Sequence, residues 1–261
     1  MSGVDLAWHA YGDGPPLVVL HGLFGAGRNW RTIADRLAGR FKVYAVDLRN
    51  HGASPWSDEM TFAAMVGDLE AFFLARQLYS ATLIGHSLGG KTAMLFAMAH
   101  PALVDALVVV DIAPVVYDHS YLPHIRAMQA IDLGAITRRG EAEAQLTEAL
   151  GDPPLCRFLV QNLRHRPEGG FRWRINLDAI GRHMADLVSF PDVGEQEYEG
   201  RTLFVSGEHS DYIERRHQSA IFAHFPQAEF AVIANAGHRV HADQPTAFVE
   251  RVTDFLDSGY A

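Results

Sequence analysis

The sequence predicts an α/β protein with an open, mostly parallel central sheet flanked by helices on both faces, and with a helical cap inserted in it. Three observations support this fold class. Short apolar runs without clean alternation recur along the chain, as expected of parallel strands buried on both faces. Amphipathic helical patterns lie between these runs, and one long helical stretch interrupts the repeat.

The predicted strands are rich in Val, Ile and Leu. They are residues 16–22, 42–48, 81–87, 106–112, 202–208 and 229–235. The predicted core helices place apolar side chains on one stripe and are residues 29–40, 65–78, 88–100 and 244–256. Pro101 stops the third helix, and Pro245 lies in the first turn of the last one, where a missing N–H does little harm. Strand and helix thus alternate, which favours parallel strands joined by helical crossovers.

The alternation stops between residues 114 and 199, where the chain shows three or four helical patterns in succession. A segment of this length is much longer than an ordinary crossover, and an insertion after the carboxyl end of a strand can cover a ligand site there. We therefore predict one domain whose core is residues 1–113 and 200–261, with residues 114–199 as an inserted helical cap.

Composition excludes several classes of function. The 261 residues carry a formal net charge of −9 and no run of Lys or Arg, so no nucleic-acid partner is expected. No segment approaches the roughly 18 continuous apolar residues of a membrane span, and the N-terminus does not resemble a signal peptide. We expect a soluble, cytoplasmic protein, and the sequence does not indicate an oligomeric state. Cys156 is the only cysteine, which excludes an internal disulfide and a multi-thiolate metal site.

The most specific motif is Gly85-His86-Ser87-Leu88-Gly89, which fits the G-x-S-x-G nucleophile elbow. It follows a predicted strand and precedes a predicted helix, as that motif requires. The turn is sterically crowded, so glycines flank it and the Ser87 hydroxyl is directed away from the sheet. The alternative, a helix-capping serine beside chance glycines, does not need this strand-turn-helix context.

A hydroxyl needs a base to remove its proton, and in nucleophile-elbow enzymes the histidine comes last in the chain. His238 lies in a loop of small residues just after the last apolar run, at the expected place. His241 is close by and would form a metal pair with His238, but no third ligand is suggested. We therefore expect no metal at this pair.

Two backbone N–H groups are candidates for stabilising an oxyanion. The first is that of Leu88, directly after the nucleophile at the start of a helix. The second is that of Leu23, in the glycine-containing loop after the first predicted strand, with Phe24 as the neighbouring wall. This loop lacks the glycine order of a dinucleotide-binding loop and the Lys-Ser/Thr pair of a P-loop, so a phosphate-binding role is disfavoured.

Three aspartates are candidates for the acid that orients the histidine. Asp111 ends an apolar run, where a buried carboxylate would be costly without a functional partner. Asp211 also follows a predicted strand, but it lies further into a polar loop, where an N-cap or surface role would explain it. Asp178, in the cap, is more typical of a surface residue. We favour Asp111, with Asp211 as the alternative acid.

The ordered motifs at residues 20–25, 46–54, 84–94, 108–114 and 235–245 resemble the α/β-hydrolase superfamily, in particular the YbfF-type bacterial esterases and their eukaryotic abhydrolase relatives. The resemblance spans nearly the whole chain, including the cap segment at residues 171–180. It implies the α/β-hydrolase fold and a carboxylic-ester hydrolase. It also implies Ser87 as nucleophile, His238 as base and Asp111 as acid, since Asp111 follows the predicted strand before the penultimate one. No metal or organic cofactor is implied.

The expected partner is a small-molecule ester with a short to medium acyl chain, because a cap over the strand ends limits the pocket. The same triad would also serve an acyl-CoA thioesterase or an acyltransferase, and a non-catalytic ligand-binding protein is the alternative from another class. Arginines of the cap at residues 164–174 could meet an anionic leaving group, although such charges usually form a solvated face. The candidate pocket walls are Phe24, His86, Tyr117, Tyr121, Leu122, Ile125, Met128, Leu159, Trp173 and Leu187.

Overall fold

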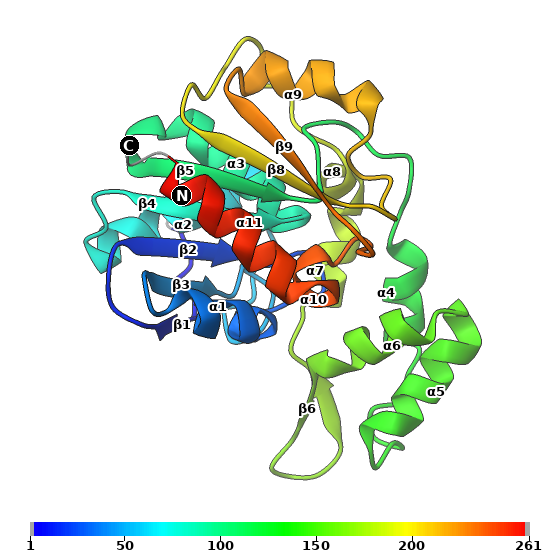
Figure 1. Cartoon of the computed structure of the whole chain (residues 1–261). Coiled ribbons are helices and arrows are strands. Elements are labelled where there is room, and N and C mark those ends of the chain that lie inside the picture. Colours follow the sequence, from blue (N-terminus) through cyan, green and yellow to red (C-terminus); the bar gives the residue numbers. More distant parts are fainter. Residues whose placement is uncertain (1–2, 259–261) are drawn as a thin grey trace.

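The computed structural model describes residues 3–258 and has a seven-stranded sheet at its centre (Figure 1). The strand order is β1-β3-β2-β4-β5-β8-β9, and every neighbouring pair is parallel except β1 with β3. The strands are β1 (Trp8–Tyr11), β2 (Pro16–Leu20), β3 (Lys42–Val46), β4 (Ala81–His86), β5 (Val104–Val110), β8 (Thr202–Gly207) and β9 (Ala228–Ile233). The predicted α/β-hydrolase fold with a mostly parallel central sheet is confirmed.

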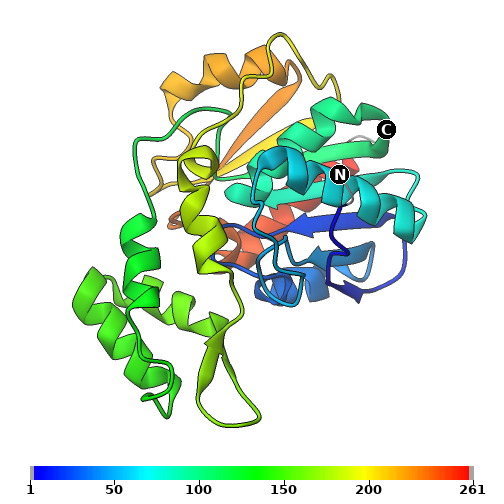
Figure 2. The same cartoon turned by 180° about the vertical axis from the view of Figure 1, so that it is seen from behind.

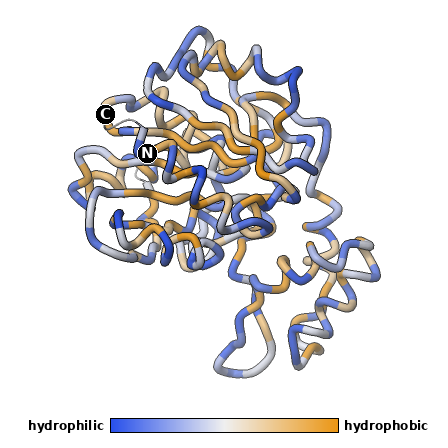
Figure 3. Tube along the Cα trace, in the orientation of Figure 1, coloured by the Kyte–Doolittle hydropathy of each residue, from blue (hydrophilic) through white to orange (hydrophobic). Residues whose placement is uncertain are grey.

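The helices of the core cover both faces of this sheet. They are α1 (Arg31–Leu37), α2 (Phe62–Arg76), α3 (Leu88–Ala99), α9 (Gln218–His224), α10 (Val240–Asp243) and α11 (Pro245–Asp257), with short 3-10 turns η1 (Gly27–Trp30), η2 (Pro101–Leu103) and η4 (Arg215–His217). Alternate residues of the strands pack into two separate apolar clusters. Helices α2, α3 and α9 contribute to one cluster, and α1 and α11 to the other. The central strands are accordingly hydrophobic along their length (Figure 3).

A long segment between β5 and β8 extends from the carboxyl ends of the strands (Figures 1 and 2). Its helical elements are α4 (Leu122–Gln129), α5 (Arg139–Leu150), α6 (Pro153–Leu159), η3 (Val160–Asn162), α7 (Leu177–Arg182) and α8 (Met184–Val188). It also contains a two-stranded antiparallel hairpin of β6 (Leu163–His165) and β7 (Phe171–Trp173). We refer to this segment as the cap. The hairpin was not predicted from the sequence, because its strands have three residues each and show no apolar run.

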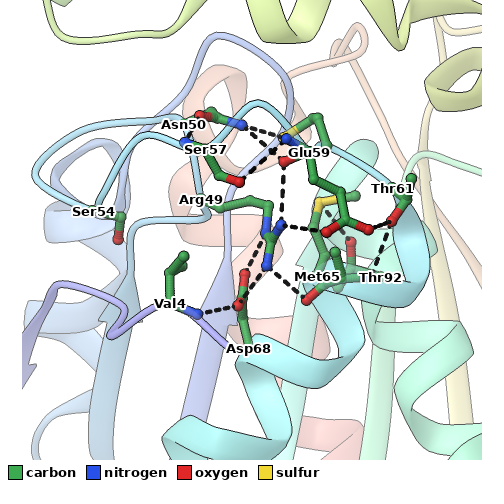
Figure 4. A network of polar contacts seen from close by, with 12 residues as sticks. Val4, Arg49, Asn50, Ser54, Ser57, Glu59, Thr61, Met65, Asp68 and Thr92 are labelled. Carbon is green, nitrogen blue, oxygen red and sulfur yellow. Dashed lines mark hydrogen bonds and ion pairs between the residues drawn. The ribbon is translucent and has the colours of Figure 1, made fainter. Parts of the chain in front are cut away.

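The loop after β3 is fixed by a buried ion pair, which also supports the cap (Figure 4). The Arg49 guanidinium donates to both carboxylate oxygens of Asp68 on α2, at 2.6 and 2.8 Å. Asp68 also accepts the N–H of Val4, which attaches the N-terminal segment. The neighbouring Asn50 accepts from Asn176, the residue that caps α7. The loop after β3 therefore contacts both the core and the cap.

Residues 3–258 contain no helix that is both long and apolar enough to cross a membrane. Cys156, in α6, is buried in the cap as a free thiol.

Candidate active site

Ser87 lies at a sharp turn between β4 and α3, with φ 51° and ψ −116°. A positive φ is strained for a residue with a side chain, and such strain is typical of a nucleophile elbow. The glycines of the motif make the turn sterically possible. A Cβ at Gly85 would lie 2.4 Å from the carbonyl oxygen of Gly89, and one at Gly89 would lie 2.5 Å from that of His21. The close approach of three backbone segments thus explains both glycines.

His238 and Asp111 lie within hydrogen-bonding distance. The Nδ1 of His238 is 2.7 Å from Oδ2 of Asp111, which is completely buried at the end of β5. Because a carboxylate only accepts hydrogen bonds, Nδ1 is the donor, and in the neutral ring the lone pair is therefore on Nε2. Asp111 has a φ of 54°, another strained conformation, and its own N–H is bonded to the carbonyl of Val205. The backbone thus holds the carboxylate toward the histidine loop.

Two further donors hold the Asp111 carboxylate. The Gly207 N–H donates to Oδ1 at 3.2 Å, and the Ser210 hydroxyl donates to Oδ2. Ser210 lies in the loop after β8, so this loop helps to hold the Asp111 carboxylate in place. Asp211, the alternative acid, is exposed. Asp178 is also exposed, and its carboxylate accepts from Gln129 at the surface of the cap.

Two aromatic side chains fix the position of His238. The Tyr212 ring stacks on the His238 ring with centroids 3.9 Å apart, and the Tyr212 hydroxyl is 2.6 Å from that of Tyr121 in the cap. The Nε2 of His86 donates to the His238 carbonyl at 2.8 Å. Burial, followed by the neighbouring His238, holds the pKa of His86 well below its usual value, so this ring stays neutral. Sequence reasoning missed Tyr212 and the role of Ser210 as a donor to Asp111, since both depend on contacts between segments that are far apart in the sequence.

His241 is placed differently from His238. Its ring stacks on Trp30 with centroids 3.9 Å apart, and burial lowers its pKa to about 3. It lines the same cavity as His238, but Asp111 bonds only the His238 ring. Within residues 3–258, no group of three or more His, Cys, Asp or Glu side chains is arranged to hold a metal ion.

The loop after β2 is held in shape by a buried histidine. The Leu48 N–H donates to Nε2 of His21 at 3.0 Å, and Nδ1 of His21 donates to the Gly22 carbonyl at 2.8 Å. This pattern needs a neutral imidazole, and burial lowers the pKa of His21 to about 4. Leu23 follows in this loop and lines a small cavity together with Ser87 and Leu88. Leu88 is the first residue of α3, where N–H groups have no intrahelical acceptor.

A cavity of about 280 Å³ opens beside Ser87 and His238. Of the candidate pocket walls, Phe24, His86 and Tyr121 line it, while Tyr117 and Leu187 line the adjoining small cavity. The other candidates are absent from both linings, and they are Leu122, Ile125, Met128, Leu159 and Trp173. Met128 is completely buried because it faces the interior of the cap, and Trp173 lines a separate groove. The cap wall of the cavity is instead formed by residues of α6 and the turn before it, which are Asp152, Pro154, Leu155 and Phe158.

Lys91 joins helix α3 to the end of the cap. This side chain is almost fully buried one turn after Ser87, and its ammonium donates to the carbonyls of Val188 at 2.8 Å and Ser189 at 2.6 Å. The Leu187 carbonyl is 3.4 Å away. Burial lowers the pKa of Lys91 to about 7. The last turn of α8 is therefore bonded to the helix that begins at the candidate nucleophile.

The sheet order, the strand-serine-helix turn and the inserted cap define the class of protein as an α/β-hydrolase. A family described as "alpha/beta hydrolase fold" matches residues 15–135. The chain is 41% identical to the sn-1-specific diacylglycerol lipase ABHD11 of Xenopus laevis, over 98% of this chain and 85% of that protein. It is 32% identical to the esterase YbfF of Escherichia coli K12, over 93% of each chain.

A solved structure, described as a marine microorganism esterase, superposes with a TM-score of 0.94 at 39% identity, over 97% of this chain and all of the other. The chain therefore belongs to the α/β-hydrolase family and is a carboxylesterase-type hydrolase, as the resemblance of its motifs indicated.

Proposed function

We propose that the protein hydrolyses carboxylic esters of short to medium acyl chains through an acyl-enzyme on Ser87. The observation that carries this proposal is the 2.7 Å bond between His238 and the buried Asp111, at the edge of the cavity that Ser87 lines. A histidine oriented in this way has its Nε2 lone pair available for the serine proton. The named esterases and lipases among its relatives support the same chemistry.

In the first half of the reaction, His238 accepts the proton of Ser87 as the hydroxyl oxygen attacks the ester carbon. The oxygen of the tetrahedral intermediate is stabilised by the N–H groups of Leu88 and Leu23. Asp111 stabilises the imidazolium, which then gives its proton to the leaving alcohol. In the second half, His238 activates a water molecule that releases the acid and restores Ser87.

The acyl-chain preference follows from the size of the cavity. A volume of about 280 Å³ is at the lower end of the range typical of small-molecule sites, and Phe24, Tyr121 and Phe158 wall it with apolar surface. A long acyl chain would have to displace α6 of the cap, whereas a chain of a few carbons would not. We therefore expect the protein to prefer soluble esters over emulsified long-chain lipids.

The test measures kcat/KM over p-nitrophenyl esters of increasing acyl length, in parallel with acyl-CoA thioesters and with an alcohol added as competing acceptor. Short and medium oxygen esters should be hydrolysed fastest. Ser87→Ala should fold and lose about 10³-fold or more of the activity, and it should no longer react with a fluorophosphonate. Retention of a tenth of the activity would exclude Ser87 as nucleophile. Faster turnover of the thioesters, or acyl transfer to the alcohol, would reassign the reaction.

A further inference from the structure

The β6–β7 hairpin of the cap presents four arginines on one face. Arg164 and Arg172 are directly opposite each other in the strand register, and Arg166 and Arg174 lie two residues further along each chain segment. Because side chains alternate between faces along a strand, these four project from the same side. The other side packs into the cap through Leu163 and other apolar residues. The hairpin is thus amphipathic, and its polar face consists of arginines.

These arginines have no acidic partner. None of the four forms an ion pair within residues 3–258, although the whole chain carries a net charge of −9. Asp47 is a carboxylate close enough to act on Arg174, but its two oxygens accept from the N–H groups of Gly27 and Ala53. The Nε of Arg174 is enclosed and has no hydrogen-bond acceptor. Positive charge is therefore concentrated here, and the one nearby carboxylate, Asp47, offsets only part of it.

Two more arginines increase the repulsion. Arg28 donates to the Gln161 carbonyl, and Arg139 donates to that of Leu163, so both guanidinium groups are held beside the hairpin. Burial, followed by the charge of Arg174, lowers the pKa of Arg28. Burial and then Arg164 lower that of Arg174. Like charges placed across from each other weaken a two-stranded ribbon, so stability alone does not account for this arrangement.

The arginine face borders a groove of about 730 Å³. The groove is also lined by Trp56, whose side chain is largely exposed, and by one acidic residue, Asp178, which accepts from Gln129. It shares no lining residue with the cavity beside Ser87. The two sites are therefore distinct, and a ligand in the groove does not have to be the ester.

We propose that this arginine groove binds a phosphate-bearing anion. A guanidinium presents two parallel N–H donors that match the oxygens of a phosphate, and clusters of arginines are a common means of recognising such groups. A diphosphate, or a row of lipid phosphates at a membrane surface, would relieve the mutual repulsion of the arginines. The tryptophan at the groove edge is compatible with either source.

The experiment measures binding to the full chain in two arms. Isothermal titration calorimetry with inorganic pyrophosphate tests a soluble anion, and flotation with phosphatidylglycerol-containing vesicles, against pure phosphatidylcholine vesicles, tests a lipid phosphate. Arg164→Gln with Arg172→Gln should lower affinity at least tenfold in the arm that binds. Both residues are exposed, so the variant should fold and keep its hydrolysis of a small soluble ester.

The matched control is Arg76→Gln with Arg251→Gln, which removes the same charge from helices α2 and α11. It should bind like the unchanged protein. Binding of pyrophosphate identifies a soluble ligand class, and binding only to anionic vesicles identifies a membrane surface. The proposal is wrong if neither arm shows binding, or if both double variants lose affinity equally, because that would indicate only net charge. Ser87→Ala should bind normally, which separates this outcome from any failure of the proposed hydrolysis.

Discussion

Replacing Asp111 by Asn is the sharpest test of the candidate triad. In the unchanged protein the carboxylate accepts from the His238 ring, from the Ser210 hydroxyl and from the Gly207 N–H. An asparagine of the same shape must place an NH₂ group where one oxygen was. If that group faces His238, it requires Nδ1 as an acceptor, which moves the ring proton to Nε2. The lone pair needed to accept the Ser87 proton is then lost.

The expected loss in kcat is about 10⁴-fold, the size seen when a triad histidine is held in the wrong tautomer. This corresponds to about 5.5 kcal/mol of transition-state stabilisation. The assay is hydrolysis of a short p-nitrophenyl ester at saturation, with circular dichroism to show that the variant is folded. Asp211→Asn, the matched control on an exposed carboxylate, should cost less than about tenfold. An equal or larger loss at Asp211 would refute the reasoning and move the acid to the loop after β8.

Three further predictions concern the candidate base, the buried ion pair of Arg49 with Asp68, and the buried histidines. His238→Ala should lower kcat about 10³-fold or more and His241→Ala far less, because only His238 is bonded to Asp111; equal losses in the ester assay would leave the base unassigned. Asp68→Asn should lower the free energy of unfolding in urea by about 3 kcal/mol, since it leaves the buried Arg49 with only the more distant Glu59 carboxylate, at 3.9 Å, as an ionic partner; a change below about 1 kcal/mol would contradict a structural role for the pair. Acidification from pH 6.5 to 5.5 should also lower the free energy of unfolding, by about 4 kcal/mol. The reason is that burial lowers the pKa values of His21, His51 and His241 to between about 3 and 4 and holds that of His86 well below its usual value, so the unfolded chain takes up protons that the folded chain does not. Each histidine contributes about 1 kcal/mol, and a flat urea midpoint over this interval would be inconsistent with this reasoning.

Sequence reasoning was most successful where the determinants are local. The six apolar runs are the six parallel strands, and for the inner strands burial on both faces explains the continuous apolar signal. The elbow around Ser87 is also local. Its glycines are required by close contacts within the turn itself and with the end of one neighbouring strand. The edge strand β1 was missed because it is short and partly exposed. The hairpin of the cap was missed because its exposed face consists of arginines.

The sequence could not show which way a side chain points, because tertiary packing sets that direction. Asp111 and Asp211 both follow strands, and they are distinguished by the burial of Asp111 and by its bonds to His238 and Ser210, which its positive-φ backbone makes possible. The same holds for the pocket. Tyr121 and Met128 lie within two turns of each other, yet one faces the cavity and the other faces the interior of the cap. The apolar pattern alone cannot distinguish these two orientations, because they depend on how the helix is placed against the rest of the molecule.

The bonds of Lys91 determine which part of the cap is free to move. Residues 187–189 are tied to α3 by the lysine ammonium, so they cannot shift without breaking those bonds or moving the helix that begins at the candidate nucleophile. The ammonium also lies 5.0 Å from the ring centroid of Tyr117, whose N–H donates to the Val188 carbonyl at 3.2 Å. The start of the cap is therefore bonded to its end, and any opening of the cavity that keeps these bonds has to move the cap elements between them.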